Sequence, residues 1–524
     1  MVGRRGVIYF LLVDRFANGD PTNDGAVNPA DPQAFHGGDL AGLTAHLDAL
    51  SELGVDTLWL APIAEMRDTP FYGHGAFHGY WTRALDALEP RFGTPADLAA
   101  LTGQLRERHI GLVLDMVYNH VAPEHPWMTE RPAWFHGAGP IQDWHDPVEV
   151  VTHDVHGLPD LAVEREEVFD YLRGASSHWL RTAGPVAFRL DAVRHLDPVF
   201  LTRMGRELRA EAGPGFQLWG EVFDGNVATV LATREAAGLD AVFDFPLHYA
   251  LADVVCDDAP AVAIPAILDR TAHLPPDTFI TFLDNHDTAR ITTRCHDDAH
   301  RVDLALELLF ALRGRPMITW GTEWGAQGAG EPDNRADMRW APAEGAEQDA
   351  WMARLALLRT RAAERKASPA LRAGQSRTLA LGRSWFVVER RSGEDVRWVV
   401  YNGGDSELEF AGTTFDARSV RVLDPRADAP ALRAPRVTAG VVLITATGAP
   451  ALAPGDRLRL VGGAPLVGDW DPARGLDLPA RVRLEPIAYQ WKLAVVRADG
   501  RVEWAPGGNQ AQLGGSGHLR VRWE

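Results

Sequence analysis

The chain has 524 residues, of which 46% are hydrophobic and 23% charged, so it holds enough apolar material for several packed cores and is neither disordered nor fibrous. Lys and Arg number 52 against 71 Asp and Glu, and the formal net charge of −19 argues against nucleic acid or an anionic membrane as a main partner. The two cysteines, Cys256 and Cys295, can form at most one disulfide, which leaves the compartment open.

The sequence contains no run of about 18 apolar residues, so we expect no membrane span. Its first residues also lack the charged, apolar and small-residue pattern of a signal peptide. Because such a peptide can be removed from a precursor, secretion stays compatible with this beginning.

Short β-rich runs alternate with stretches of helical period from residue 7 to about residue 365, as in a parallel sheet with crossover helices. Eight runs can be counted, at residues 7–16, 56–63, 110–117, 185–191, 216–222, 241–245, 279–283 and 316–320. Eight strand and helix units predict an α/β fold, a (β/α)8 TIM barrel formed by residues 1–119 and 162–367.

Three further segments are predicted around this barrel. Residues 120–161 are rich in His, Pro, Trp and Asp with little helical period, so we expect an irregular subdomain inserted after the third strand. Residues 368–446 contain strand-like pieces, including 441–445, between Gly, Asp and Ser turns, as in a β-sandwich. A Pro/Ala run at 448–455 then leads into a last β-rich segment, so that residues 447–524 form a small β-sandwich module.

Acidic residues stand at the ends of four predicted strands. Asp115 ends the third strand, Asp191 the fourth and Glu221 the fifth, and the seventh is followed by Asp284 and Asp287. The active site of a TIM barrel forms at the carboxyl ends of its strands, so these acids are expected to share one cleft in which pKa shifts can be exploited.

These four segments resemble the signature regions of the α-amylase family, glycoside hydrolase family 13, in the same order and on the same strands. The resemblance implies that Asp191 is the nucleophile, Glu221 the general acid/base and Asp287 the third acid that holds sugar hydroxyls, which is a retaining arrangement. Arg189 shares a strand face with Asp191 and is expected to keep it anionic. An uncharged environment around Trp219 and Phe223 is expected to raise the pKa of Glu221.

The resemblance also extends to residues that would bind the sugar. His78-Gly-Tyr80-Trp81 follows the second predicted strand and Leu158-Pro-Asp160-Leu lies in the insert. By position, the substrate-binding residues are Tyr80, Trp81, His120, Arg189, Arg194 and His286. Arg194 would reach the leaving-group side, and Ala187 departs from the family, which usually has Gly there.

Calcium is the cofactor that the resemblance implies, since a Ca²⁺ ion ties the insert to the barrel in this family and takes oxygen ligands. Its ligands here would include Asn119, Asp160 and the backbone carbonyl of His195. A second loop resembles the extra calcium loop of cyclodextrin glucanotransferases and would use Asn18, Asp20, Asn23, Asp24, Gly37 and Asp39. The same residue types also simply make turns, which is the alternative interpretation.

The last segment resembles a starch-binding module of carbohydrate-binding module family 20. By this resemblance Trp470 and Trp504 form a stacking platform for two glucose rings, while Lys492 and Asn509 bind hydroxyls. The loop that carries a second binding site in that family is short here, between Asp471 and Arg483, so we expect one site only.

The leading hypothesis is a secreted, monomeric α-amylase that cleaves internal α-1,4 bonds of starch, maltooligosaccharides and other α-glucans. A transglycosylating or maltogenic member of the family, of the cyclodextrin glucanotransferase, maltogenic amylase or cyclomaltodextrinase type, is the second. A non-catalytic glucan-binding protein is a remote third, because it predicts a missing acid and all three acids are present.

Overall fold

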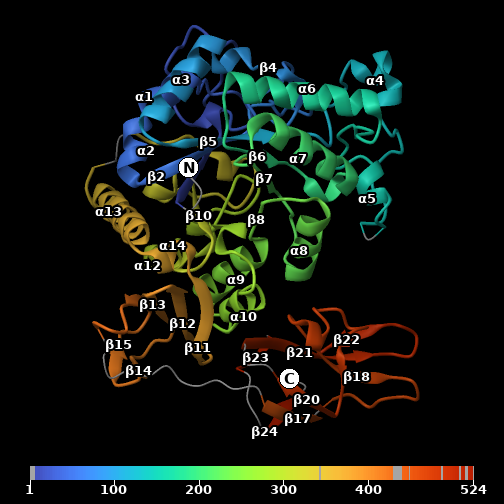
Figure 1. Ribbon diagram of the computed structural model, residues 1–524, viewed down its shortest axis with the longest axis vertical. Helices are drawn as coiled ribbons and strands as arrows, with labels where there is room; N and C mark the ends of the chain where they lie inside the picture. Colours follow the sequence, from blue (N-terminus) through green and yellow to red (C-terminus); the bar gives the residue numbers. More distant parts are fainter. Residues whose placement is uncertain are drawn as a thin grey trace.

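The computed structural model describes residues 6–428 except 145 and 341–343, and then 440–447, 449–484, 488–506, 509–513 and 517–522. Eight parallel strands close into a barrel, in the order β1-β10-β9-β8-β7-β6-β5-β2 (Figure 1). They are β1 (Val7–Leu11), β2 (Val55–Leu60), β5 (Gly111–Met116), β6 (Ala187–Leu190), β7 (Gln217–Gly220), β8 (Ala241–Phe243), β9 (Phe279–Phe282) and β10 (Arg315–Thr319). These are the eight predicted runs, so the TIM-barrel prediction is confirmed.

Helices surround the barrel (Figure 1). The main ones are α1 (Leu40–Ala45), α2 (Leu47–Leu53), α3 (Pro95–Glu107), α6 (Glu166–Thr182), α7 (Pro198–Ala212), α8 (Val227–Ala236), α9 (Phe245–Cys256), α10 (Ala263–Arg270), α12 (Ala299–Ala311) and α13 (Ala346–Ala367). The start of α3 shows how sequence sets such a boundary: Thr94 accepts from the Asp97 amide, Asp97 accepts from the Thr94 amide, and Pro95 occupies the first helical position.

The insert after β5 is largely irregular, with the short helices α4 (Trp127–Glu130) and α5 (Glu149–Thr152). Isolated bridges join His120 to Asp160 and Phe135 to Leu161, which closes the segment at its base. The rings of Trp127 and Trp134 pack on Tyr171 of α6, with centroids 4.9 and 5.6 Å apart. The insert is therefore anchored to the barrel by aromatic contacts as well as by its bridges.

A four-stranded antiparallel sheet follows α13 and the short helix α14 (Pro369–Ala373). Its order is β11 (Gln375–Leu381), β12 (Trp385–Ser392), β13 (Asp395–Asn402) and β16 (Ser419–Leu423), beside the pair β14 (Leu408–Phe410) and β15 (Thr413–Phe415). Phe386 and Val388 join the barrel core, whereas Val387 between them joins a separate small core with Trp398. This alternation shows that both faces of the sheet are covered.

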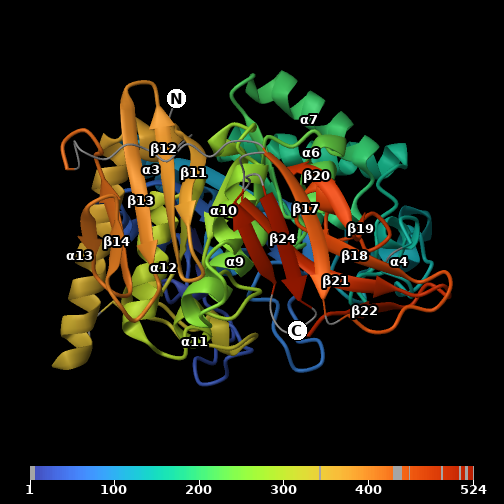
Figure 2. The same cartoon turned by 90° about the horizontal axis from the view of Figure 1, so that it is seen from below.

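The C-terminal module contains β17 (Gly440–Thr447), β18 (Arg457–Gly462), β19 (Leu476–Asp477), β20 (Ala480–Leu484), β21 (Ala488–Val496), β22 (Val502–Trp504), β23 (Gln510–Leu513) and β24 (Gly517–Arg522). We expected residues 441–445 to form a strand of the preceding sandwich. They lie in β17, which instead pairs with β20 and β24 of this module. The physical reason is its apolar side: Ile444 is buried in the module's core with Leu460 and Leu493. Figure 2 shows this module against α9 and α10.

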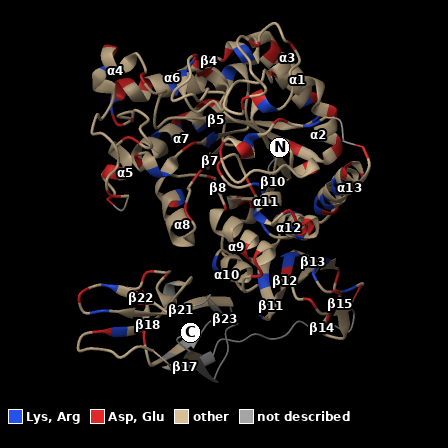
Figure 3. Cartoon of the chain, turned by 180° about the vertical axis from the view of Figure 1, so that it is seen from behind, with Lys and Arg blue, Asp and Glu red and all other residues tan. Residues whose placement is uncertain are grey.

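Cys256, at the end of α9, forms a disulfide with Cys295, and their Cα atoms are 4.4 Å apart. Among the described helices, none combines the length and the apolar character that crossing a membrane requires. The positions of acidic and basic residues are interspersed along the ribbon in Figure 3.

Candidate active site

A cleft of about 630 Å³ opens at the carboxyl ends of the barrel strands. Eight residues predicted for catalysis or substrate binding line it together: Tyr80, Trp81, His120, Asp191, Arg194, Glu221, His286 and Asp287. His195, which was predicted as a calcium ligand, lines it as well. They come from loops after five different strands and from segments far apart in sequence. The barrel topology brings these side chains to one place, as expected for this fold.

Arg189 is the centre of the charge arrangement at the base of the cleft. Its Nη1 lies 2.9 Å from Asp115 Oδ1 and 2.8 Å from Asp191 Oδ1, and its Nη2 lies 2.8 Å from Glu221 Oε1. Arg189 and Asp191 are two residues apart on one strand, so both point to the same side. Burial alone would lower the pKa of Arg189, but the surrounding carboxylates raise it well above its usual value.

Glu221 is the acid that this environment protonates. Burial raises its pKa, the nearby Arg189 opposes this rise, and Asp191 adds to it, so that the pKa reaches about 8. The Ala192 amide donates to Glu221 Oε2 at 3.1 Å and fixes the carboxyl group. At neutral pH Glu221 is thus an acid that can donate a proton.

The environment of Glu221 differs from the uncharged one that we expected. Trp219 is fully buried within the barrel and donates its indole N–H to Gln217 Oε1 at 3.0 Å, while Phe223 lines the cleft and is 45% exposed. The groups that shift the pKa of Glu221 after burial itself are charged: Arg189 and Asp191. Its pKa is therefore raised because the acid is buried among other carboxylates.

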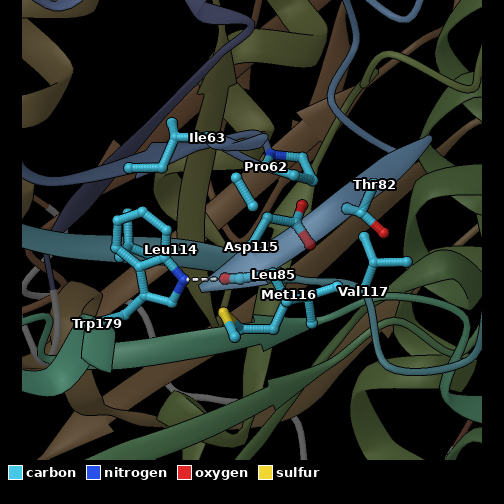
Figure 4. Close-up of a pocket in the computed structure, with 10 residues that line it drawn as sticks. Pro62, Ile63, Thr82, Leu85, Leu114, Asp115, Met116, Val117 and Trp179 are labelled. Atoms are coloured by element: carbon cyan, nitrogen blue, oxygen red, sulfur yellow. Dashed lines mark hydrogen bonds between the residues drawn. The ribbon is translucent and has the colours of Figure 1, made fainter. Parts of the chain in front are cut away.

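Asp115 shares this charge arrangement, although the sequence only placed it at a strand end without a role. The Tyr80 hydroxyl donates to Asp115 Oδ2 at 2.9 Å, and Arg189 Nη1 donates to the same oxygen at 3.0 Å. Burial raises the pKa of Asp115 to about 7, against the effect of Arg189. Behind it lies a cavity of about 10 Å³, close to the volume that one water molecule needs, which Thr82 and Trp179 also line (Figure 4).

Asp287 is held in the opposite protonation state. Burial would raise its pKa, but the neighbouring His286 and Arg335 lower it below the usual value. His286 Nε2 lies 3.1 Å from Asp287 Oδ2, and Arg335 Nη2 lies 3.2 Å from Asp287 Oδ1. Because burial lowers the pKa of His286 to about 3, the imidazole is neutral at neutral pH, and the charges that then keep Asp287 ionised are those of Arg335 and Arg189.

Rings and imidazoles surround the acids. The Tyr80 ring is stacked on His286, with centroids 5.0 Å apart and planes within 4°. His120 Nε2 lies 3.1 Å from the Tyr80 carbonyl oxygen, and burial lowers the pKa of His120. Flat rings next to neutral imidazoles offer stacking surface and hydroxyl partners together, as a sugar ligand requires.

Arg194 also lines the cleft, and its Nη1 lies 3.3 Å from Asp224 Oδ2. His195 Nδ1 lies 2.9 Å from the Val150 carbonyl oxygen, and burial lowers its pKa. These contacts join the segment after β6 to the loop after β7 and to the insert.

Several lining residues were missed from sequence. Trp144 and His156 come from the irregular insert, and Glu331 and Arg335 come from the loop after β10. Arg335 Nε also donates to the His286 carbonyl oxygen at 3.0 Å. None of these four lies at a strand end, and loop segments have no periodicity that could have pointed to them.

The residues predicted for a first calcium ion meet at one point. Asn119 Nδ2 donates to Asp160 Oδ1 at 2.7 Å and to the His195 carbonyl oxygen at 3.0 Å. His136 Nδ1 is hydrogen-bonded to the second oxygen of Asp160. Burial raises the pKa of Asp160 to about 6, so this carboxylate lacks full compensation for its charge. An amide, a carboxylate and a carbonyl group are the ligand types that Ca²⁺ takes, and the set fits the ion.

The second predicted calcium loop forms two adjacent groups. Asn18 Nδ2 contacts Asp24 Oδ1 at 2.8 Å, beside the backbone of Gly37. Asp39 accepts from the amides of Gly19 and Asp20, at 3.0 and 2.8 Å, and from Asn23 Nδ2 at 3.2 Å. Within the described residues, Asn23 Oδ1 is buried without a hydrogen-bond partner, which is the kind of oxygen that a cation would satisfy.

Both predicted sets combine carboxylates with amide or main-chain groups. In the described ranges, no group of three or more His, Cys, Asp and Glu side chains is placed to hold a metal. Hard oxygen ligands of mixed type suit calcium and not a transition metal.

The predicted starch-binding residues lie in the C-terminal module at different places. Trp470 and Asn509 line a cavity of about 180 Å³ between the module and the barrel. Trp504 on β22 is 39% exposed and is absent from that lining, and Lys492 on β21 is partly exposed. Both tryptophans are placed by backbone pairs next to β21. Trp504 pairs with Ala494 of β21. Trp470 donates its amide to the carbonyl oxygen of Gly462, and Gly462 pairs with Trp491 of β21.

A protonated acid and a second carboxyl group on the same guanidinium are the parts that acetal cleavage between sugars needs: one group protonates the leaving oxygen and the other attacks or stabilises the anomeric carbon. Ring stacking and neutral hydroxyl partners beside them complete such a site. The fold and the cleft therefore define a glycosidase built on a TIM barrel.

Comparison with known proteins identifies the family. A family model described as "Alpha amylase, catalytic domain" matches residues 10–369. The chain belongs to the α-amylase family and is a glycosidase that acts on α-glucans.

Relatives of several activities are similar to this chain. A cyclomaltodextrin glucanotransferase of Klebsiella oxytoca is 28% identical over 96% of this chain and 88% of its own length. An α-amylase of Anoxybacillus is 30% identical, with a TM-score of 0.70, over 80% of this chain and 96% of that chain. The structure of an α-amylase from Geobacillus thermoleovorans complexed with acarbose is 27% identical, with a TM-score of 0.68, over 98% of this chain and 99% of that chain.

Proposed function

We propose that the protein is an endo-acting α-amylase that hydrolyses internal α-1,4-glucosidic bonds of starch and maltooligosaccharides with retention of anomeric configuration. The observation that carries this proposal is the single guanidinium of Arg189, which contacts both Asp191 and Glu221. It makes the two carboxyl groups neighbours, in keeping with the short spacing of about 5–5.5 Å that retaining glycosidases use.

In the first half of the reaction, Glu221 gives its proton to the oxygen of the leaving sugar while an Asp191 oxygen attacks the anomeric carbon. The glycosidic bond breaks and a covalent glycosyl ester forms on Asp191. In the second half, Glu221, now ionised, takes a proton from water, and the water oxygen displaces Asp191 from the sugar. Two inversions at one carbon retain its configuration.

The remaining residues have positioning roles in this proposal. Arg189 contacts Asp191, the proposed nucleophile, and holds its carboxyl group in place. Asp287, fixed by Arg335, is placed to accept hydrogen bonds from sugar hydroxyls. The stacked pair of Tyr80 and His286 covers one side of the cleft. A sugar held against these groups enters the reaction already oriented.

An endo mode of action is supported by the number of separate segments that line the cleft. Tyr80 and Trp81 come from the long segment after β2, and Arg194 and Phe223 come from the segments after β6 and β7. A glucan chain that binds along all of these segments presents an internal bond to Asp191 and Glu221.

A second candidate function is transfer of the glycosyl group to a sugar hydroxyl, or release of maltose. It is favoured by the similarity to the Klebsiella oxytoca glucanotransferase over nearly the whole chain and by a cyclomaltodextrinase of a Bacillus species that is 30% identical over 64% of this chain. Product analysis separates the two functions. On starch, the proposed amylase lowers viscosity promptly and releases mixed oligosaccharides with α configuration. Dominant maltose or cyclic products would favour the second candidate, and β products would contradict retention.

The chemical roles are tested by Glu221→Gln, with the exposed Glu130→Gln as its matched control. Loss of the general acid should lower kcat on starch by two to four orders of magnitude, since that is the range that proton transfer contributes. The control variant should match the parent protein. Near-normal turnover by the Glu221 variant would overturn the assignment.

We further infer that Ca²⁺ is bound at both oxygen-rich places, by Asn119, Asp160 and the His195 carbonyl oxygen and by the loop of Asn18, Asp20, Asn23, Asp24, Gly37 and Asp39. The ion would supply structural charge compensation that joins the insert to the barrel.

The C-terminal module would adsorb to starch through Trp470, Lys492, Trp504 and Asn509. The Cys256–Cys295 disulfide supports secretion, since disulfides persist in oxidising compartments, and we expect the secreted enzyme to act as a monomer.

A further inference from the structure

The cavity of about 180 Å³ between the C-terminal module and the barrel has walls from both parts. The barrel supplies Tyr249, Asp253 and Arg270, and the module supplies Trp470, Gln490 and Asn509. We call it the interface cavity. The family resemblance gave a role to Trp470 and Asn509 within the module, but it gave none to the three barrel residues.

Direct contacts hold the two walls together. Arg270 Nη2 lies 2.5 Å from Asp469 Oδ1, and its Nη1 donates to the Gly463 carbonyl oxygen. Asn226 Nδ2 donates to the Asp469 carbonyl oxygen at 3.2 Å, and the Ala488 amide donates to Asp269 at 2.8 Å. The side chains of Arg270 and Asp469 are 11% and 7% exposed, so this ion pair is only weakly screened by solvent. The module is thus fixed on the barrel next to the cavity.

The walls combine ring surface with hydroxyl-binding groups. Tyr249 is 37% exposed, and Trp470 is partly exposed with its indole nitrogen close to the Gly463 backbone. Asn509 and Gln490 carry amides, and Asp253 carries a carboxylate. An uncharged, hydroxyl-rich ring that stacks on aromatic faces suits these groups.

Phe245, which is buried and lines neither space, packs between an aromatic residue of the active-site cleft and one of the interface cavity. Phe223 lines the cleft, and its ring centroid lies 4.5 Å from that of Phe245. Phe245 lies 6.3 Å from Tyr249, which lines the interface cavity. Phe245, Tyr249 and Asp253 are four residues apart along α9, so they share one face of the helix. Gly225, which also lines the interface cavity, belongs to the same loop as Phe223.

We propose that the interface cavity is a binding site for an α-glucan chain that extends from the leaving-group side of the active-site cleft past Phe223 and onto Tyr249 and Trp470. This proposal rests on the proposed hydrolysis of α-glucans and deepens it, because it assigns a specificity site for long chains to barrel and module together. The barrel residues Phe223 and Tyr249 are then part of substrate binding, and the module positions the chain for cleavage.

The test compares substrates of different length. Maltooligosaccharides of three to five glucose units are too short to leave the cleft, whereas a linear maltodextrin of about twenty units can reach the interface cavity. For the parent protein, we measure kcat/KM on both and take the ratio of long to short. In Tyr249→Ala and Trp470→Ala this ratio should fall about three- to tenfold, the fold-change expected for one lost aromatic contact. Tyr249→Phe keeps a ring and should restore most of the ratio.

Met352→Ala serves as the matched control, because Met352 is an exposed apolar side chain on α13, away from both linings. It should leave the ratio at the parent value, and melting temperatures check that every variant is folded. Should Trp470→Ala unfold the module, Tyr249→Ala on the barrel still decides the question. A ratio unchanged in folded Tyr249→Ala would overturn the interface site. Failure of the proposed function looks different, since the parent protein would then hydrolyse neither substrate.

Discussion

Glu221 Oε1 lies 2.8 Å from Arg189 Nη2, yet the pKa of Glu221 is raised to about 8. A guanidinium so close to a carboxyl group ordinarily lowers its pKa. Here the same guanidinium also contacts Asp115 and Asp191, so its charge is shared among three acids, and burial outweighs what is left for Glu221. Sharing one cation among three carboxyl groups is how the site keeps one of them protonated.

The first prediction concerns the pH dependence of catalysis. Since the pKa of Glu221 is about 8, its proton is present at neutral pH and lost as the pH rises above that value. We expect kcat/KM on soluble starch to fall along an alkaline limb centred near pH 8. The measurement is a pH–rate profile across this range, and activity that stays constant far above pH 8 would contradict the role of Glu221 as the acid.

A second prediction links the same residue to stability. The pKa of Glu221 in the folded protein, about 8, lies above its ordinary value of 4.5, so folding takes up a proton between these two pH values. Its contribution to stability is fully present below pH 4.5 and lost as the pH rises through 8. Glu221→Gln stays neutral, so its melting temperature should exceed that of the parent protein by a few degrees at alkaline pH, and this advantage should vanish toward pH 4.5. A difference that does not change with pH would refute this reasoning.

Removal of calcium provides the third prediction. If Ca²⁺ binds only the folded protein, chelation should lower the melting temperature, because an ion at a hundred times its Kd stabilises by about 2.7 kcal/mol. Asn119→Ala should remove the part of this effect that belongs to the insert, and Asp39→Ala the part that belongs to the loop of Asn18. An unchanged transition after exhaustive chelation would exclude both sites.

The disulfide leads to a fourth prediction. Cys256 and Cys295 are 39 residues apart in sequence, and closing a loop of that length stabilises the folded state by about 4 kcal/mol in the chain-entropy description. The double variant with Ser at both positions should therefore melt at a lower temperature than the parent protein. Reducing agent should lower the melting temperature of the parent protein and leave that of the double variant in place. Equal effects on both would show that reduction acts elsewhere.

Adsorption to granular starch is the fifth prediction. Trp470 and Trp504 are both accessible on the C-terminal module. Replacing both by Ala should abolish depletion of the protein from solution by starch granules, since stacking surface is lost at two places. Met352→Ala should adsorb like the parent protein. Full adsorption by the double variant would place granule binding on other residues.

The barrel and its acids were predictable from sequence for a physical reason. Buried parallel strands read as short apolar runs, and a barrel places its functional groups where these runs end, so Asp191, Glu221 and Asp287 could be placed in one cleft without coordinates, while their roles were implied by the resemblance. Asp115 stood at such an end as well, but its contacts with Arg189 and Tyr80 depend on side-chain directions that a linear pattern does not contain.

Contacts between distant segments were not predictable. Arg335 holds Asp287 from a loop without periodicity, and Arg270 pairs with Asp469 across almost two hundred residues of sequence. Where the module sits on the barrel is decided by such pairs. The partners of a strand could not be predicted either. Residues 441–445 have a strand pattern that would suit either of the two neighbouring sheets.

The pairing of β17 with β20 and β24 also determines how the protein can be divided. A shortened enzyme that ends in the Pro/Ala run would keep β17 while losing both partner strands, and it would carry a bare β-edge able to pair with other molecules. A cut that precedes Gly440 removes the strand with its sheet. Engineers who exchange the C-terminal module between relatives should therefore transfer β17 as its first strand, together with the Asp469 that meets Arg270.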